Sequence, residues 1–105
     1  IANSLSGLAG NDTLAGGKGN DTIHGGLGDD TIYNKLPNVT DNTLTVDSLY
    51  GDAGNDYISG SADDDKLGGG DGNDLINGGG GVDICQGDAG TDSTEGGCET
   101  VVSIP

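Results

Sequence analysis

Apolar and polar positions recur in a fixed order along this chain of 105 residues. The order defines a nine-residue frame that opens with glycine, has Asp at position six and has an aliphatic residue at position eight. Eight copies follow the frame, at 7–15, 16–24, 25–33, 51–59, 60–68, 69–77, 78–86 and 87–95, with Cys85 and Thr94 standing in for the aliphatic residue in the last two. A further copy at 42–50 keeps Asp47 and Leu49 but lacks the glycines. Positions seven to nine predict a three-residue strand whose middle side chain faces inward.

A three-residue strand is unstable alone, so the repeat must stack to bury its aliphatic positions. Two frames are predicted to form one coil with a turn on each side, and the strands of successive coils are predicted to pair in parallel. Residues 34–41 fall outside the frame, and we expect them to form an inserted surface loop between two coils. The chain, 1–105, is therefore predicted to be a single all-β solenoid.

The composition provides few large apolar side chains for an ordinary hydrophobic core. The chain has 23 glycines and 18 acidic residues, but only three lysines, no arginine and a net charge of -15. Self-repulsion opposes a compact state, so we expect a positive partner to be needed for folding. Nucleic acid and anionic membrane surfaces are poor partners, because both require Lys and Arg. The chain also has no apolar stretch long enough for membrane insertion, and we expect a mature chain or a fragment.

The first six positions of each frame carry the candidate chemistry. Glycines at positions one, two and four are expected to allow positive φ and close backbone approach, so that carbonyl oxygens converge on one centre. The Asp at position six adds a carboxylate to these carbonyls. Oxygen-only ligands in a flexible turn suit calcium, whereas magnesium requires a tighter octahedron and keeps its waters.

The frame resembles the repeats-in-toxin (RTX, hemolysin-type) nonapeptide G-G-x-G-x-D-x-U-x, a calcium-binding β-helix repeat, over residues 7–95. The resemblance implies a right-handed parallel β-roll with each ion between two turns stacked 18 residues apart. The lower turn, nearer the N-terminus, would supply its Asp and the carbonyls of positions two and four. The upper turn would supply its Asp and the carbonyls of positions one and three, so that each interior Asp serves two ions.

Carried over to this chain, the resemblance implies one column of four complete sites. Its carboxylates would be Asp12, Asp30, Asp56, Asp74 and Asp92. Its carbonyls would come from Leu8, Gly10, Gly25, Gly26, Leu27, Gly28, Gly51, Asp52, Ala53, Gly54, Gly69, Gly70, Asp71, Gly72, Gly87 and Ala89.

The second column departs from the family pattern. Its carboxylates would be Asp21, Asp47, Asp65 and Asp83. The turn of Asp47 has Asn42, Thr43 and Thr45 in place of glycines, so we expect incomplete sites there. A complete site is expected between Asp65 and Asp83, with the carbonyls of Ser61, Asp63, Gly78 and Gly80. The total is five to seven calcium ions, and about seven would bring the charge from -15 to near -1. Binding and folding are therefore expected to be one event.

Two cysteines mark the end of the repeat. Cys85 occupies an inward aliphatic slot, and Cys98 follows 13 positions later, where the frame decays. A disulfide is predicted, closing a C-terminal cap over 96–105, with two reduced buried thiols as the alternative. A disulfide indicates an oxidising compartment, and calcium turns of millimolar affinity are useful only outside the cell. We therefore expect a secreted, extracellular protein of bacterial type.

The leading hypothesis is a calcium-folded structural module of a secreted protein whose active domain lies outside this chain. The alternative is a self-assembling extracellular fibre, surface-layer, matrix or adhesin protein held by calcium, with end-to-end association of coils. A disordered linker is a further alternative, but a linker would not keep an aliphatic residue two places after each Asp. We expect no enzyme, because His24, the only histidine, has no Ser or Cys at a recognisable spacing. Asn38 is the one glycosylation candidate in an exposed segment.

Overall fold

The computed structural model describes residues 4–17, 19–33, 46–60, 63–96 and 98–102. Within these ranges all regular structure is β, and no helix is long and apolar enough to cross a membrane. The predicted loop 34–41, including Asn38, lies outside the described residues, as do Ser61 and the glycine replacements Asn42, Thr43 and Thr45.

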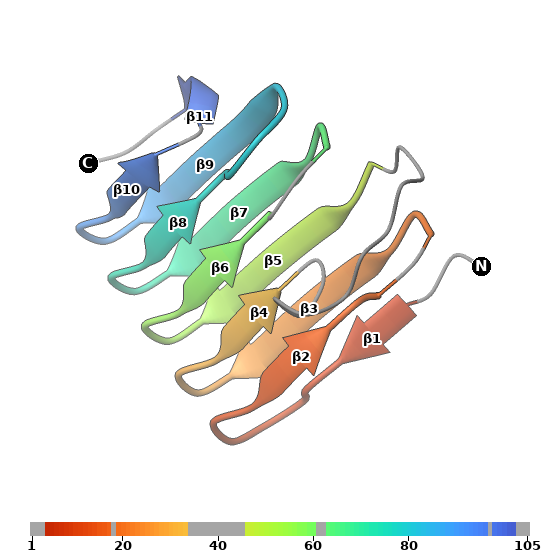
Figure 1. Cartoon of the computed structure of the whole chain (residues 1–105). Coiled ribbons are helices and arrows are strands. Elements are labelled where there is room, and N and C mark those ends of the chain that lie inside the picture. Colours follow the sequence, from red (N-terminus) through yellow and green to blue (C-terminus); the bar gives the residue numbers. More distant parts are fainter. Residues whose placement is uncertain (1–3, 18, 34–45, 61–62, 97, 103–105) are drawn as a thin grey trace.

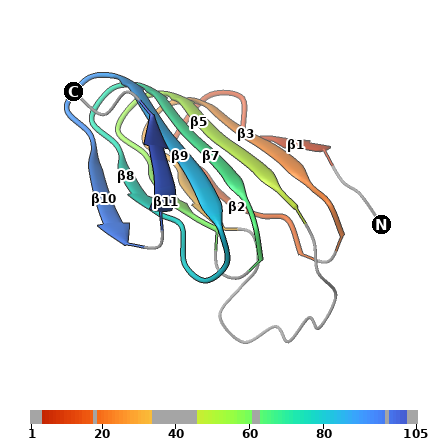
Figure 2. The same cartoon turned by 90° about the horizontal axis from the view of Figure 1, so that it is seen from above.

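The strands form two parallel sheets that face each other (Figures 1 and 2). One sheet runs in the order β1 (Ser4–Ser6), β3 (Thr22–Leu27), β5 (Ser48–Ala53), β7 (Lys66–Asp71), β9 (Asp83–Ala89), β11 (Cys98–Val102). The other contains β2 (Thr13–Ala15), β4 (Thr31–Tyr33), β6 (Tyr57–Ser59), β8 (Leu75–Asn77) and β10 (Ser93–Gly96). The chain alternates between the sheets, so two strands and two turns make one coil. The predicted parallel β-roll is confirmed.

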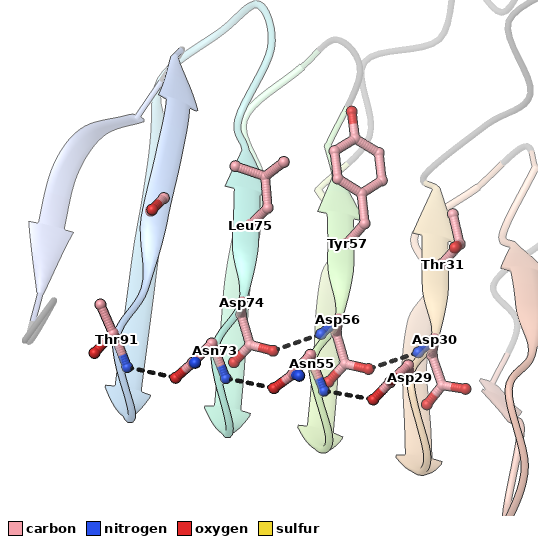
Figure 3. A pocket seen from close by; sticks show the side chains of 11 residues that line it. Asp29, Asp30, Thr31, Asn55, Asp56, Tyr57, Asn73, Asp74, Leu75 and Thr91 are labelled. Carbon is pink, nitrogen blue, oxygen red and sulfur yellow. Dashed lines mark hydrogen bonds between the residues drawn. The ribbon is translucent and has the colours of Figure 1, made fainter.

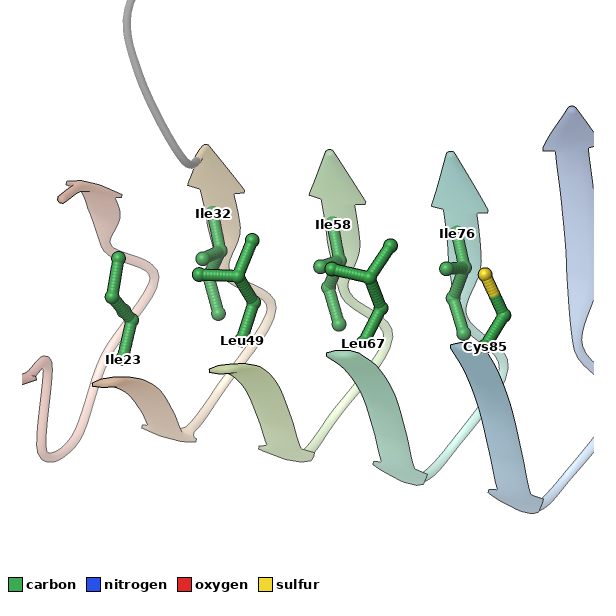
Figure 4. Packing of buried hydrophobic residues seen from close by; sticks show 7 residues of the cluster. All are labelled: Ile23, Ile32, Leu49, Ile58, Leu67, Ile76 and Cys85. Carbon is green, nitrogen blue, oxygen red and sulfur yellow. The ribbon is translucent and has the colours of Figure 1, made fainter. Parts of the chain in front are cut away.

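The aliphatic residue at position eight points into the narrow space between the sheets (Figure 4). Along the chain of coils these side chains stack directly on one another, for example Ile23 on Leu49 and Ile32 on Ile58. Seven side chains at position eight are fully buried, six of them aliphatic and one a cysteine: Ile23, Ile32, Leu49, Ile58, Leu67, Ile76 and Cys85. The core is thus a double row of aliphatic side chains, as the frame predicts.

Pairing across the 34–41 segment explains how the coils stay in phase. Thr22 pairs with Ser48 and Thr31 pairs with Tyr57, so these partners are 26 positions apart instead of the 18 found between Thr13 and Thr31. The difference equals the length of 34–41. The additional residues therefore leave the alternation of turns intact.

The expected three-residue strands are found in only part of the structure. β2, β4, β6 and β8 have three residues, but β3, β5 and β7 have six. The prediction is wrong for the longer strands because positions one to three of their turns also pair with the next coil, as between Leu27 and Ala53. Hydrogen bonds between stacked turns thus extend the sheet into the glycines.

The C-terminal end carries the predicted disulfide, between Cys85 and Cys98, with a Cα–Cα distance of 5.7 Å. Cys98 opens β11, which pairs in parallel with β9 and shifts register between Cys98 and Thr100. The bond therefore fastens the outermost strand of the larger sheet to its neighbour. A cap over the whole of 96–105 stays a prediction.

Two glycines at position four provide a matched test of turn stacking. Gly54 and Gly10 have similar φ values, 119° and 109°. A Cβ on Gly54 would collide with the carbonyl oxygen of Gly28, whereas a Cβ on Gly10 would meet nothing within 4 Å. Gly10→Ala should lower the free energy of unfolding by about 1–2 kcal/mol through backbone strain. Gly54→Ala should lower it by about a further 1–3 kcal/mol through overlap. Urea unfolding in saturating calcium measures both, and equal losses would contradict this packing.

Candidate metal centre

The position-six aspartates form the first predicted column through hydrogen bonds between coils. In each step, the main-chain N–H of the lower Asp donates to Oδ1 of the upper Asp. The distances from N to Oδ1 are 2.8 Å for Asp12 to Asp30, 2.8 Å for Asp30 to Asp56, 2.7 Å for Asp56 to Asp74 and 2.8 Å for Asp74 to Asp92.

The second column is built in the same way. The N to Oδ1 distances are 2.6 Å for Asp21 to Asp47, 3.0 Å for Asp47 to Asp65 and 2.8 Å for Asp65 to Asp83. Asp47 takes part although its turn lacks glycines in the sequence. The geometry therefore brings together both predicted sets of carboxylates.

The second carboxylate oxygen of the first column faces a buried space. Oδ2 of Asp12, Asp30, Asp56, Asp74 and Asp92 is buried without a hydrogen-bond partner. A buried charged oxygen without a partner costs several kcal/mol, so a row of them is unfavourable unless a cation lies beside it.

The glycines at position one show which other atoms lie beside these Oδ2 atoms. A Cβ on Gly25 would lie 2.5 Å from Oδ2 of Asp30 and 2.7 Å from the carbonyl oxygen of Gly51. A Cβ on Gly7 would lie 2.6 Å from both Oδ2 of Asp12 and the carbonyl oxygen of Gly25. A lower carboxylate and an upper position-one carbonyl therefore face one small cradle.

The same cradle recurs in the second column. A Cβ on Gly60 would lie 2.8 Å from Oδ2 of Asp65 and 2.7 Å from the carbonyl oxygen of Gly78. Asp63, at position four of this turn, has its carbonyl oxygen directly against Gly81 of the turn above. Gly80 is an exposed turn residue.

Carbonyls from positions two and four also point at the turn above. A Cβ on Gly26 would collide with the carbonyl oxygen of Leu8, and a Cβ on Gly28 with that of Gly10. In four further pairs a Cβ on the upper glycine would collide with the carbonyl oxygen of the lower residue: Gly70 with Asp52, Gly54 with Gly28, Gly72 with Gly54 and Gly90 with Gly72.

Several predicted carbonyl ligands already accept a main-chain hydrogen bond. Leu8 accepts from Leu27 at 2.7 Å, and Leu27 accepts from Gly10 at 2.9 Å. Asp71 and Ala89 accept likewise from Gly54 and Gly72, at 2.9 and 3.0 Å. A carbonyl has two lone pairs, so each retains one for a cation.

The glycines serve two separate physical purposes, which corrects one expectation. Among the described residues, positive φ occurs at positions two and four and at none of the position-one glycines. Position one requires glycine for space, because its Cβ would enter the cradle. Leu8, Asp52 and Asp88 adopt φ of 70–73° at position two, and Asp63 adopts 80° at position four.

Burial changes the acidity of the two central carboxylates. Desolvation is the main cause that raises the pKa of Asp56 from 3.8 to about 6 and that of Asp74 to about 7. Neighbouring charges add to the increase, from Asp30 and Asp29 for Asp56 and from Asp56 and Asp92 for Asp74. The metal-free fold therefore disfavours the ionised form at the middle of the column.

A ladder at position five was missed by the sequence analysis, which treated this position as variable. In the first column the main-chain N–H of each upper residue donates to Oδ1 of the residue one coil below (Figure 3). The distances are 2.9 Å for Asp29 to Asn11, 2.9 Å for Asn55 to Asp29, 2.8 Å for Asn73 to Asn55 and 2.9 Å for Thr91 to Asn73. The signal in the sequence was the run of Asn and Asp before the frame's Asp.

The second column has only part of this ladder. Val46 donates to Asn20 at 3.2 Å and Val82 donates to Asp64 at 2.7 Å. The side chains of Val46 and Val82 have no acceptor, so the ladder stops at each valine.

His24 lies on the outer face of the larger sheet. Its Nδ1 is 3.1 Å from Oδ2 of Asp52, and its ring stacks on Tyr50 with centroids 5.0 Å apart. These contacts connect neighbouring coils and give His24 a structural role.

The donor set fits a hard divalent cation. Across the described ranges, no group of three or more His, Cys, Asp and Glu side chains converges on one point. A cation here would be held by paired carboxylates and main-chain carbonyls, which are ligands that calcium prefers.

Fold and site together define a parallel β-solenoid with aspartates stacked in its turns. The chain belongs to the RTX calcium-binding nonapeptide repeat family, whose four-copy profile matches residues 2–33, 42–75 and 62–93. Comparison with curated proteins and with solved structures gives no match. The chain is therefore a calcium-binding repeat module.

Asp56 and Asp29 provide a matched pair for testing the inward carboxylates. Asp56→Asn keeps an oxygen that accepts from the N–H of Asp30 but replaces the inward Oδ2. Asp29→Asn removes the same charge from an exposed residue and keeps the acceptor for Asn55. We expect Asp56→Asn to weaken calcium binding at the adjoining sites at least tenfold, or about 1.4 kcal/mol, and Asp29→Asn to change it less than about threefold. Calorimetric titration would contradict the assignment if both variants weakened equally.

Calcium binding should depend on pH through Asp56 and Asp74. Their folded pKa values are raised to about 6 and about 7, so their protonated forms stabilise the metal-free fold below about pH 4, and that contribution is lost as pH rises through 6–7. Calcium requires the ionised forms, so affinity should fall between pH 8 and pH 5. Titrations at pH 6 in buffers of different ionisation enthalpy should detect proton release. Absence of release would refute the link.

Proposed function

We propose that this module folds when it binds five to seven calcium ions and serves as a stabilising part of a secreted protein. The observation that carries the proposal is the row of buried Oδ2 atoms facing the carbonyls of the next turn, as with Asp30 and Gly51. Asp12, Asp30, Asp56, Asp74 and Asp92 would hold ions in one column, and Asp21, Asp47, Asp65 and Asp83 in the other.

Calcium would supply positive charge between stacked carboxylates, and the carbonyl oxygens of two turns would serve as further ligands to the ion. The chain's own contribution is alignment: hydrogen bonds between coils fix the distance between successive aspartates. A double row of aliphatic side chains with a charge of -15 is too little to hold this alignment alone. Binding energy is thus folding energy in this proposal.

An extracellular setting agrees with two features of the chain. The Cys85–Cys98 disulfide is of a kind that persists in oxidising compartments. Extracellular calcium modules typically bind at 10⁻⁴–10⁻³ M, a concentration range absent from the cytosol.

Self-assembly is the second candidate function, and one observation favours it. In the described structure β1 and β2 have a strand neighbour on one side only. The turns beside them contain Gly10 and Gly17, and a Cβ added to either glycine would meet nothing within 4 Å. A second copy could stack on this end and complete the sites below Asp12.

Sedimentation velocity in EDTA and in about 10 mM calcium separates these functions. The folding module should change from an extended coil to a compact monomer with a Cα radius of gyration of 12.1 Å. Calcium-dependent growth into larger species would favour assembly instead. An unchanged sedimentation coefficient would refute calcium-dependent folding.

A further inference from the structure

The last turn of the first column is held less well than the interior turns of that column, 25–30, 51–56 and 69–74. Turn 87–92 contacts the coil beneath through the N–H of Asp74 to Oδ1 of Asp92 at 2.8 Å and the N–H of Gly72 to the carbonyl of Ala89 at 3.0 Å. No turn is stacked above it in the described part of the chain. By contrast, turn 69–74 has a stacked turn on both sides. In a solenoid, stability is the sum of such neighbour contacts, so turn 87–92 has about half the usual support.

The disulfide encloses this turn. Cys85 and Cys98 are 13 positions apart, and the segment between them contains the whole of 87–92, including Asp92. The bond thus limits the freedom of the C-terminal one of the two first-column turns, 7–12 and 87–92, that have a single stacked neighbour in the described structure.

Both ends of the bond are anchored in packed structure. Cys85 is fully buried and stacks in register on Leu67, in the aliphatic row. Cys98 pairs with Asp83, and Val101 pairs with Cys85, in the ladder between β11 and β9. The chain that leaves β9 therefore comes back to pair with β9 as strand β11. The disulfide joins the two ends of the segment that contains turn 87–92, even before this turn contacts the coil below.

We propose that the Cys85–Cys98 disulfide is a positioning element for the calcium site between Asp74 and Asp92, and that calcium affinity at this site depends on its oxidation state. The inference rests on the proposed calcium-dependent folding. Reduction transfers two electrons and two protons from a dithiol, cleaves the S–S bond into two thiols and leaves the dithiol as a disulfide. Closure of a loop of this size corresponds to about a 100-fold difference in the equilibrium for ordering the turn.

The test is a calcium titration of the full chain followed by NMR at two amides. Gly90 reports the last turn, and Gly28 reports a turn three coils below the last turn with stacked neighbours on both sides. The oxidised chain is compared with the dithiol-treated chain and with Cys85→Val/Cys98→Ala. Valine restores an aliphatic residue to the buried slot, so this variant removes the cross-link while keeping the row packed.

We expect the calcium midpoint at Gly90 to rise up to about 100-fold in both uncross-linked forms and the midpoint at Gly28 to change less than about threefold. In the Asp92→Asn background, reduction should no longer shift any midpoint by more than about threefold. Identical titrations of oxidised and reduced chains would overturn the proposal. Equal weakening at Gly90 and Gly28 would also overturn it, since the bond would then act on the whole fold. No calcium response at Gly28 in the oxidised chain would instead refute the proposed function itself.

Discussion

Stacking in this solenoid places like charges on top of one another. The N–H of one buried Asp donates to the carboxylate of the Asp in the next coil, so each additional coil lengthens a column of buried acids. Desolvation and neighbouring carboxylates then raise the pKa of Asp56 and Asp74. The fold cannot form the hydrogen bonds between its position-six aspartates without also creating this charge. Cation binding and coil stacking are therefore two consequences of one arrangement.

Glycine is needed at different positions of the turn for different reasons. Position one leaves room beside the inward carboxylate, as Gly25 does for Asp30, and any side chain there would fill the cradle. Positions two and four adopt positive φ, which Asp52 and Asp63 also achieve. Asp visits this conformation more readily than most residues. Glycine is therefore needed at position one for space alone, whereas at the stacked glycines of positions two and four the backbone adopts positive φ and a Cβ would also collide with the turn below.

Much of this fold could be predicted because the frame is repeated. Phase was enough to assign the inward slots of Ile23 and Ile32, the family resemblance gave the two columns of aspartates, and the presence of only two cysteines favoured the pairing of Cys85 with Cys98. The extension of β3 into Gly26 and Leu27 could not be predicted, because it depends on hydrogen bonds to a turn 26 residues away. The role of position one was misassigned for a similar reason: the sequence shows that glycine is required but does not distinguish a need for φ from a need for space.

Position five was overlooked because its side chains vary along the chain, although the four accepting residues of the first column, Asn11, Asp29, Asn55 and Asn73, share the same chemistry. Asn and Asp both present an Oδ1 that accepts an N–H from the coil above, so they are equivalent in this ladder. Its bonds run from upper main chain to lower side chain, as from Asn55 to Asp29, while those of position six run from lower main chain to upper side chain, as from Asp30 to Asp56. Two stacked turns that share both bonds are held together at two neighbouring positions, five and six.

The two columns differ in how often both bonds occur. Every step of the first column has them, from Asn11 up to Thr91. In the second column the step from Val46 to Asp64 lacks the position-five bond, because valine cannot accept it. The turns of the first column are therefore the better preorganised, and less of the binding energy of a cation is used to order them. The same cation can thus bind the two sides of one coil with different affinity, although the aspartates on both sides are stacked alike.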